Sequence, residues 1–361
     1  MVPRHASRLP ALLRRLAAAV GLAGLGTLAL VRQALGQAPA DVAGYLQNVV
    51  GLSADQVQAI ERGDVVVKSL PAAGDLDIAV FGGTTVRVPR EFFLHRFEDL
   101  KTSLPRTTRM AFGVFSTPPT TADVTALTAE QDDVDQLKQC KPGDCGIKLP
   151  AAQITSLRDA VNWSGPNVNA QVDSLARAAL VRYVAAYQRR GNAAMLDYAD
   201  RSTAVSAAAA FDSLLAQSKY LFALDSSFQG YLHDYPNREL PGAASKFYWT
   251  KDANSPLKPV ITATQFATYT SPGQSNITLI GLKLIYADHY YQAGLDLIAL
   301  VDRAGEAPSI YLLTVRRFRF DKLKTGFISL KGRVEGGLRD ALQRDLTELR
   351  AQMEQAYQSK E

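Results

Sequence analysis

The last third of the chain has the hydrophobic pattern of consecutive β-strands. Segments rich in β-branched and aromatic residues alternate with short clusters such as "TSPGQSN" and "DRAGEAP", which favour turns. Strands joined by short turns form an antiparallel meander, so the pattern predicts one here. The segments that carry this pattern are 245–251, 258–269, 276–291, 295–302 and 309–320.

A long amphipathic helix is predicted after the last of these strands, over residues 333–357. Its apolar residues recur every three or four positions and form a single stripe along the helix. A helix of this kind that follows a meander must bury its stripe against the sheet. The stripe consists of Val334, Leu338, Leu342, Leu346, Leu349 and Met353.

The earlier part of the chain predicts both strands and helices. Short strand patterns lie within residues 64–88 and 109–115, and Pro89 opens a helix between them. Residues 150–235 have helical spacing, most clearly over 171–190. The expected fold class is therefore α+β, with an antiparallel β meander packed on a long C-terminal helix and a helical insertion. The expected parts of the chain are 1–40, 41–149, 150–235 and 236–361.

This order of elements resembles the helix-grip fold of START-like and polyketide-cyclase-like proteins. It consists of an early strand and helix, a run of antiparallel strands and a long C-terminal helix, with residues 150–235 as a large insertion. The chain also looks like a group of secreted bacterial proteins without an assigned activity. That second resemblance supports export and implies no chemistry. It rests on the stretches "ERGDVVVKSLP", "FYWTKDANSPLKPVI", "YADHYYQAGLDLIALV" and "CKPGDC".

The first 40 residues have the layout of a secretory signal peptide. An arginine-rich start precedes an apolar run over residues 16–31, and 36–38 or 38–40 supplies a small-x-small cleavage triplet. This run is shorter than the roughly 20 residues that span a bilayer comfortably, so an uncleaved signal anchor is the less favoured alternative. The mature protein is expected to be exported, periplasmic or extracellular, without a stable membrane span.

The net charge of +5 belongs to this export segment. Residues 1–40 contain five arginines and no acidic residue, so their removal leaves a mature chain without net charge. The balance therefore gives no electrostatic reason to expect nucleic acid or an anionic membrane surface as a partner.

The two cysteines, Cys140 and Cys145, stand close together and predict a structural disulfide. Between them, Pro142 and Gly143 favour a type II turn, which brings its flanking residues together. In an oxidising compartment such neighbouring thiols pair. A c-type haem site would need a histidine directly after the second cysteine, where Gly146 stands, and a zinc site would need two further ligands.

The standard catalytic signatures are missing from the sequence. It contains no Gly-x-Ser-x-Gly elbow, no His-Glu-x-x-His and no Walker A loop. Ser255 and Lys258 have Ser-x-x-Lys spacing but lie among prolines in a predicted turn. Among the histidines His95, His233 and His289, only the last has neighbours that suit a pocket, because it lies among tyrosines. The favoured interpretation is a hydrogen-bonded structural residue, and no metal or cofactor is expected.

An arginine interrupts a strand face that is otherwise apolar. In the last strand, Arg316 shares a face with Leu312 and Phe318. If that face is buried, the guanidinium must find a carboxylate or an anionic ligand. The favoured alternative is a β-bulge that turns the side chain outward.

The favoured function depends on the geometry of a helix on a twisted sheet. A straight helix does not follow the curl of the sheet, so either large side chains fill the gap or a cavity remains. The resulting hypothesis is a non-enzymatic protein that binds an apolar small molecule or lipid between the sheet and the C-terminal helix. The alternatives are an enzyme with a Tyr/His/Arg cleft and an envelope interaction or structural protein. The candidate pocket residues are Trp249, Tyr286, His289, Tyr290, Arg316 and Phe318.

We predict that export removes about the first 38 to 40 residues, because the arginine-rich start and the apolar run direct secretion and cleavage. Amino-terminal sequencing of the protein from its native host should therefore begin near Asp41. An intact Met1 on membrane-bound material would support the signal anchor instead.

Overall fold

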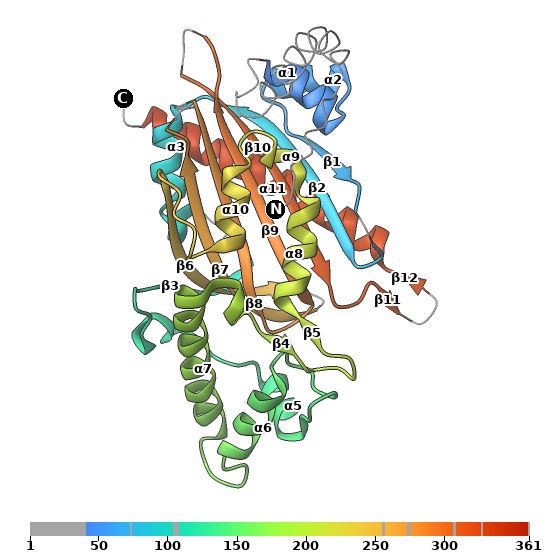
Figure 1. Cartoon of the computed structure of the whole chain (residues 1–361), viewed down its shortest axis with the longest axis vertical. Coiled ribbons are helices and arrows are strands. Elements are labelled where there is room, and N and C mark those ends of the chain that lie inside the picture. The colour runs from blue at the N-terminus through green and yellow to red at the C-terminus, as the bar shows by residue number, and fades with distance from the viewer. Residues whose placement is uncertain are drawn as a thin grey trace, which may run out of the picture. The chain divides into compact units, whose positions relative to one another are not determined.

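Eight antiparallel strands form one sheet in the computed structural model of the chain (Figure 1). The order across the sheet is β1-β2-β10-β9-β8-β7-β6-β3, so the predicted meander forms its centre. Early strands are added at both edges, because β2 pairs with β10 and β3 pairs with β6. The strands are β1 (Val66–Leu70), β2 (Asp77–Val86), β3 (Arg109–Phe115), β6 (Ala243–Asn254), β7 (Leu257–Thr270), β8 (Ile277–Ala287), β9 (Tyr291–Asp302) and β10 (Ile310–Phe320).

The structure describes residues 41–359 except 73, 104–107, 255–256, 273–275, 306–307 and 326–327. The predicted signal peptide and Ser255 lie outside the described residues. Within the part that is described, no helix combines the length and the apolar composition needed to cross a membrane.

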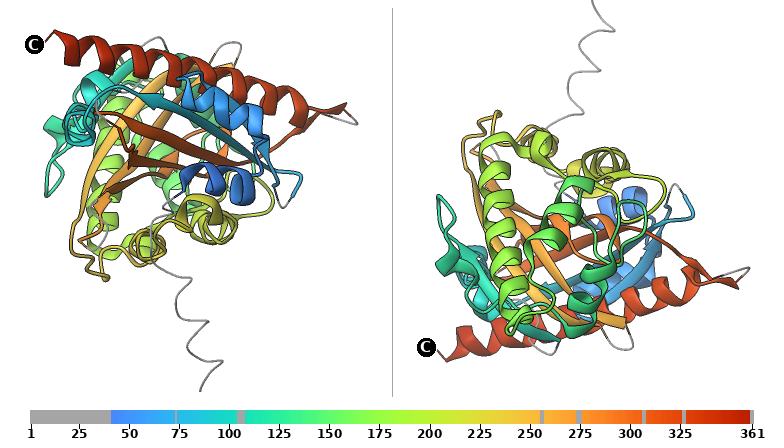
Figure 2. Two further views of the ribbon diagram at one scale, coloured as in Figure 1. Left: turned by 90° about the horizontal axis from the view of Figure 1, so that it is seen from above. Right: turned by 90° about the horizontal axis from the view of Figure 1, so that it is seen from below.

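The long C-terminal helix α11 (Lys331–Gln358) packs on one face of the sheet, as predicted (Figure 2). We call this side the α11 face. Leu342, Leu346 and Met353 are the fully buried members of its apolar stripe. They pack with strand residues such as Val80 and Leu312 in a common core. Together with the antiparallel sheet, this packing confirms the predicted α+β fold class.

Two adjacent glycines allow both faces of β2 to be covered closely. A Cβ at Gly82 would lie 2.6 Å from the Leu346 Cδ1 atom of α11, and a Cβ at Gly83 would lie 3.0 Å from the Ile60 Cδ1 atom. The missing side chains thus let α11 and the Ile60 side chain approach the strand from its two faces. Strand β2 continues through both glycines beneath the helix. This contact fixes α11 against the β1–β2 side of the sheet.

Shorter helices cover the second side of the sheet, which we call the opposite face (Figure 1). Because both faces are buried, the central strands are apolar at consecutive positions and do not alternate strictly with polar residues. Other helices of the described chain are α1 (Val42–Tyr45), α2 (Ala54–Glu61), α3 (Arg90–Phe97), α4 (Leu100–Ser103), α5 (Gln131–Gln139), α6 (Ala151–Ala160), α7 (Val168–Arg190), α8 (Ala207–Gln217), α9 (Lys219–Phe222) and α10 (Ser227–Asp234). Single turns of other helix types lie at Leu46–Val50, Thr121–Val124 and Gly191–Ala194, and short strand pairs are formed by β4 (Asp197–Tyr198) with β5 (Val205–Ser206) and by β11 (Lys324–Thr325) with β12 (Ile328–Ser329).

The disulfide between Cys140 and Cys145 is present, as predicted. The intervening turn places Gly143 at φ +87°, the conformation for which glycine is favoured. Its amide N–H donates to the Ala199 carbonyl oxygen at 2.7 Å, and the Cys145 N–H donates to that of Asp200 at 2.9 Å. The bond therefore closes a turn that joins the end of α5 to residues 199–200.

We predict that replacing both cysteines by serine lowers the free energy of unfolding by about 2 kcal/mol, the chain-entropy value for so short a loop. Denaturant unfolding with and without reductant measures this, and reduced wild type should match the double variant. The mass of the unreduced protein should also show the loss of two hydrogens. Two free thiols in the native protein would contradict the assignment.

Candidate functional site

A cavity of about 380 Å³ lies between α11 and the half of the sheet that is farther from Gly82. Part of its floor, beside the larger Tyr248 and Tyr291, has short side chains: Thr250, Thr262 and Thr264 on β6 and β7, and Gly294 on β9. These residues cannot fill the space beneath the helix, which contacts β1 and β2 most closely. The gap expected from a straight helix on a twisted sheet is therefore present.

Arg316 projects into this cavity from β10. Its Nε donates to Asp296 Oδ2 at 2.9 Å, and its Nη1 donates to Asp345 Oδ2 on α11 at 3.0 Å. The favoured bulge interpretation is wrong, because Arg316 lies directly opposite Asp296 and Val80 without a register shift. The shift in this strand occurs later, between residues 319 and 320. Arg316 therefore faces inward and finds carboxylates.

Burial and charge act against each other in this ion-pair group. Burial raises the pKa of Asp296, and the nearby Arg316 charge offsets that effect only in part. Burial alone would lower the pKa of Arg316, but Asp296 and Asp345 outweigh it and raise the pKa above its ordinary value. The Oδ1 atom of Asp296 is buried and accepts no hydrogen bond from any residue that the structure describes. This oxygen is enclosed by protein, and burial without a donor adds to the rise in the Asp296 pKa.

Apolar side chains form part of the lining: Leu282 and Leu284 of β8, Phe318 of β10 and Leu338 of α11. Gly294 leaves room for the Phe318 ring, because a Cβ there would lie 2.6 Å from it. Leu282 lies opposite Asp296 and Leu284 opposite Thr264 in the sheet, so apolar side chains adjoin charged and hydroxyl groups within the same cavity.

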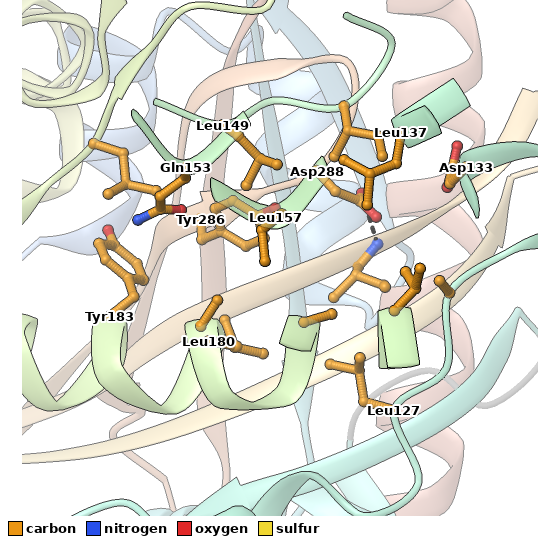
Figure 3. Close-up of a pocket in the computed structure, with 17 residues that line it drawn as sticks. Leu127, Asp133, Leu137, Leu149, Gln153, Leu157, Leu180, Tyr183, Tyr286 and Asp288 are labelled. Carbon is orange, nitrogen blue, oxygen red and sulfur yellow. Dashed lines mark hydrogen bonds between the residues drawn. The ribbon is translucent and has the colours of Figure 1, made fainter. Parts of the chain in front are cut away.

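A second, smaller cavity of about 100 Å³ lies on the opposite face, bordered by α5, α6, α7 and strands β7 and β8 (Figure 3). Figure 3 shows leucines, Tyr183 and Tyr286 around it, with the carboxylates of Asp133 and Asp288 among the lining residues. The lining is otherwise largely apolar, because the buried sides of these helices meet the sheet here.

A compact charged group adjoins this second cavity. Asp133 of α5 accepts from Lys258 Nζ at 2.8 Å, and its other carboxylate oxygen lies 3.1 Å from His289 Nε2. Burial would raise the pKa of Asp133, but hydrogen bonds from His289 and Lys258 lower it. Burial would lower the pKa of His289, and the bond to Asp133 with the charge of Asp288 raises it. Burial raises the pKa of Asp288 to about 7, against the opposing effect of His289.

The six residues predicted for one pocket are divided between the two faces of the sheet. Arg316 and Phe318 line the cavity under α11. Trp249 is fully buried on the opposite face, where its indole N–H donates to the Asp123 carbonyl oxygen at 2.8 Å. Tyr286 is also on the opposite face, because the β7–β8 pairing shifts between Ala263 and Thr264 and turns it over. Strand alternation therefore separates these side chains.

His289 and Tyr290 lie in the turn between β8 and β9, away from the larger cavity. Tyr290 has φ +64°, and its hydroxyl accepts from the Lys258 amide at 2.9 Å.

The sequence analysis did not single out Asp296 and Asp345, although the position of each in its strand or helix indicates an inward-facing charge. Asp296 is a charge inside an apolar strand, and Asp345 falls between Leu342 and Leu349 on the buried stripe of the helix.

Comparison of the chain with protein-family models, with curated proteins and with solved structures found no match. A function for the protein must therefore be inferred from the geometry of its two cavities.

We predict that Arg316→Met lowers the free energy of unfolding by about 1–3 kcal/mol, between the values for exposed and for fully buried pairs, because it leaves two part-buried carboxylates without their partner. Denaturant unfolding measures the loss. Combining it with Asp296→Leu should recover part of the loss, since the uncompensated charge is removed.

Lys324→Met is the matched control for that series. Its partner is Asp75, and the two side chains are 61% and 78% exposed, so the expected change is below about 0.5 kcal/mol. Equal effects of the Arg316 and Lys324 substitutions would contradict a stabilising role for the part-buried ion pairs of Arg316.

Proposed function

We propose that the protein is an exported binding protein that holds a small amphipathic molecule in the cavity between the sheet and α11. The observation that carries the proposal is the cavity of about 380 Å³ above a floor of threonines and a glycine. Its size falls within the roughly 300–1,000 Å³ typical of small-molecule sites. The order of elements, with a strand and helices before the meander and a gripping helix after it, supports a START-like relationship.

The lining indicates the chemistry of the ligand. An apolar body would lie against Leu284, Phe318 and Leu338, where it would displace water from apolar surface. A hydroxyl or amine on the ligand would donate to a carboxylate of the lining, such as that of Asp252, Asp345 or Glu348. Thr262 and Thr264 also line the cavity, and their hydroxyls would form further hydrogen bonds with the ligand. The lipid-like ligand expected from the sequence therefore becomes an amphipathic one.

Binding is favoured over catalysis because the lining has no pairing of a nucleophile with an imidazole or amine base. The described lining contains no histidine, cysteine, serine or lysine, and its hydroxyl and acid groups belong to threonines, tyrosines and carboxylates such as Asp252. Arg316 is already held by two carboxylates. The export that this function assumes is supported by the N-terminal sequence pattern and by the disulfide.

We predict that Ala341→Trp abolishes ligand binding, because an indole at this position on α11 would occupy the cavity. Native mass spectrometry with lipid extraction of protein from its host should show a bound molecule in wild type and none in the variant. Titration with a dansyl-labelled fatty amine provides a second measurement, with affinity expected to fall at least tenfold.

Ala351→Trp is the matched control, because Ala351 is exposed on the same helix. It should retain both the bound molecule and the affinity for the probe, and circular dichroism should show that both variants are folded. Wild type without a ligand or probe binding, or an Ala341→Trp variant that binds normally, would overturn the proposed function.

A further inference from the structure

The charged group beside the smaller cavity brings together three side chains that can ligate a metal ion. Asp133 comes from α5, whereas Asp288 and His289 follow β8. One ligand atom from each lies within 4.8 Å of the others, and all three residues are buried, with 5–6% exposure. His289 Nε2 is 3.1 Å from Asp133 Oδ2 and 4.0 Å from Asp288 Oδ2. A small closure of these atoms would surround one ion at about 2.0–2.2 Å.

Asp288 directs one carboxylate oxygen at the histidine without bonding to it. The Ile261 amide donates to its Oδ1 at 2.9 Å, whereas Oδ2 lies 4.0 Å from His289 Nε2, which is too far for a hydrogen bond. An ion between Oδ2 and the imidazole would bridge this distance and add a cation beside a carboxylate that is 6% exposed.

We propose that Asp133, Asp288 and His289 bind a divalent first-row transition-metal ion, with zinc as the representative. One imidazole and two carboxylates suit zinc better than magnesium or calcium, which prefer sites made of oxygen ligands alone. The site differs from the cavity under α11 and lies on the opposite face of the sheet. It also departs from the sequence-based expectation that the protein holds no metal.

Lys258 is the cation that competes with the metal for the charge of Asp133. Its Nζ lies 2.8 Å from Asp133 Oδ1, whereas Oδ2 faces the imidazole, so the two cations would take different oxygens of one carboxylate. The Lys258 side chain is 26% exposed and can turn toward solvent. Two carboxylates, a neutral histidine and a divalent ion balance in charge, and an ammonium that stays beside them would repel the ion. Competition with Lys258 is therefore a specific property of the proposed site.

The ion would keep one coordination position open toward the small cavity. Asp133 and Asp288 both line that cavity, which is otherwise largely apolar (Figure 3). Three protein ligands with an open fourth position are the arrangement of catalytic zinc, whereas structural zinc has four protein ligands. The open position would take water or a small anionic group such as a carboxylate.

The test is metal titration of the full mature protein after chelator treatment. Calorimetry with Zn²⁺ should show one site, and Co²⁺ should give the visible absorption of a four-coordinate ion. Asp288→Asn should weaken Zn²⁺ binding at least tenfold while its amide oxygen still accepts from Ile261. Lys258→Met should strengthen binding at least threefold, because the competing ammonium is gone.

Two comparisons make the outcome decisive. Ala341→Trp, which blocks the cavity under α11, should leave Zn²⁺ affinity unchanged, so failure of the proposed function and failure of the metal site are distinguishable. Absence of Zn²⁺ binding in both wild type and Lys258→Met would overturn the proposal. Binding that Asp288→Asn does not weaken would also overturn it, because the ion would then lie elsewhere.

Discussion

The close approach of α11 to Gly82 determines where space remains in this protein. The helix contacts β2 so closely that a single Cβ would collide with Leu346. A straight helix fixed at that edge cannot stay in contact with a sheet that twists away beneath it. The separation increases toward β6 and β7, where Thr250, Thr262 and Thr264 are too short to restore contact. Tight packing at one edge and a cavity at the other are thus two results of one constraint.

The ion pairs of Arg316 hold that arrangement in place. Asp296 comes from the neighbouring strand and Asp345 from the helix, so the guanidinium connects sheet and helix at the border of the cavity. Groups buried in this way lose hydration, which their mutual attraction offsets only when the geometry is good. Two charged contacts at 2.9 and 3.0 Å meet that condition, while the Oδ1 atom of Asp296 stays buried without a donor among the described residues.

The opposite face shows how a sheet buried on both sides separates two kinds of chemistry. There the helices bring Asp133 to the turn that carries Asp288 and His289, next to a small apolar cavity. Such carboxylates stay ionised only with a cation near them, whether Lys258, a protonated imidazole or a metal. The proposed ligand and the proposed ion therefore occupy environments that the sheet itself keeps apart.

The sequence by itself determined the features that depend on neighbours along the chain. The strand pattern of residues 245–320, the stripe of α11 and the turn that closes the Cys140–Cys145 bond all result from local spacing, and all are present. Only the tertiary structure decided which side chains meet. The bulge that turns Tyr286, the inward direction of Arg316 and the meeting of Asp133 with His289 depend on register and on contacts between distant segments. The physical reason is that a shift of one residue moves a strand side chain to the other face. The residues that it then contacts come from distant parts of the chain, so local spacing does not predict them.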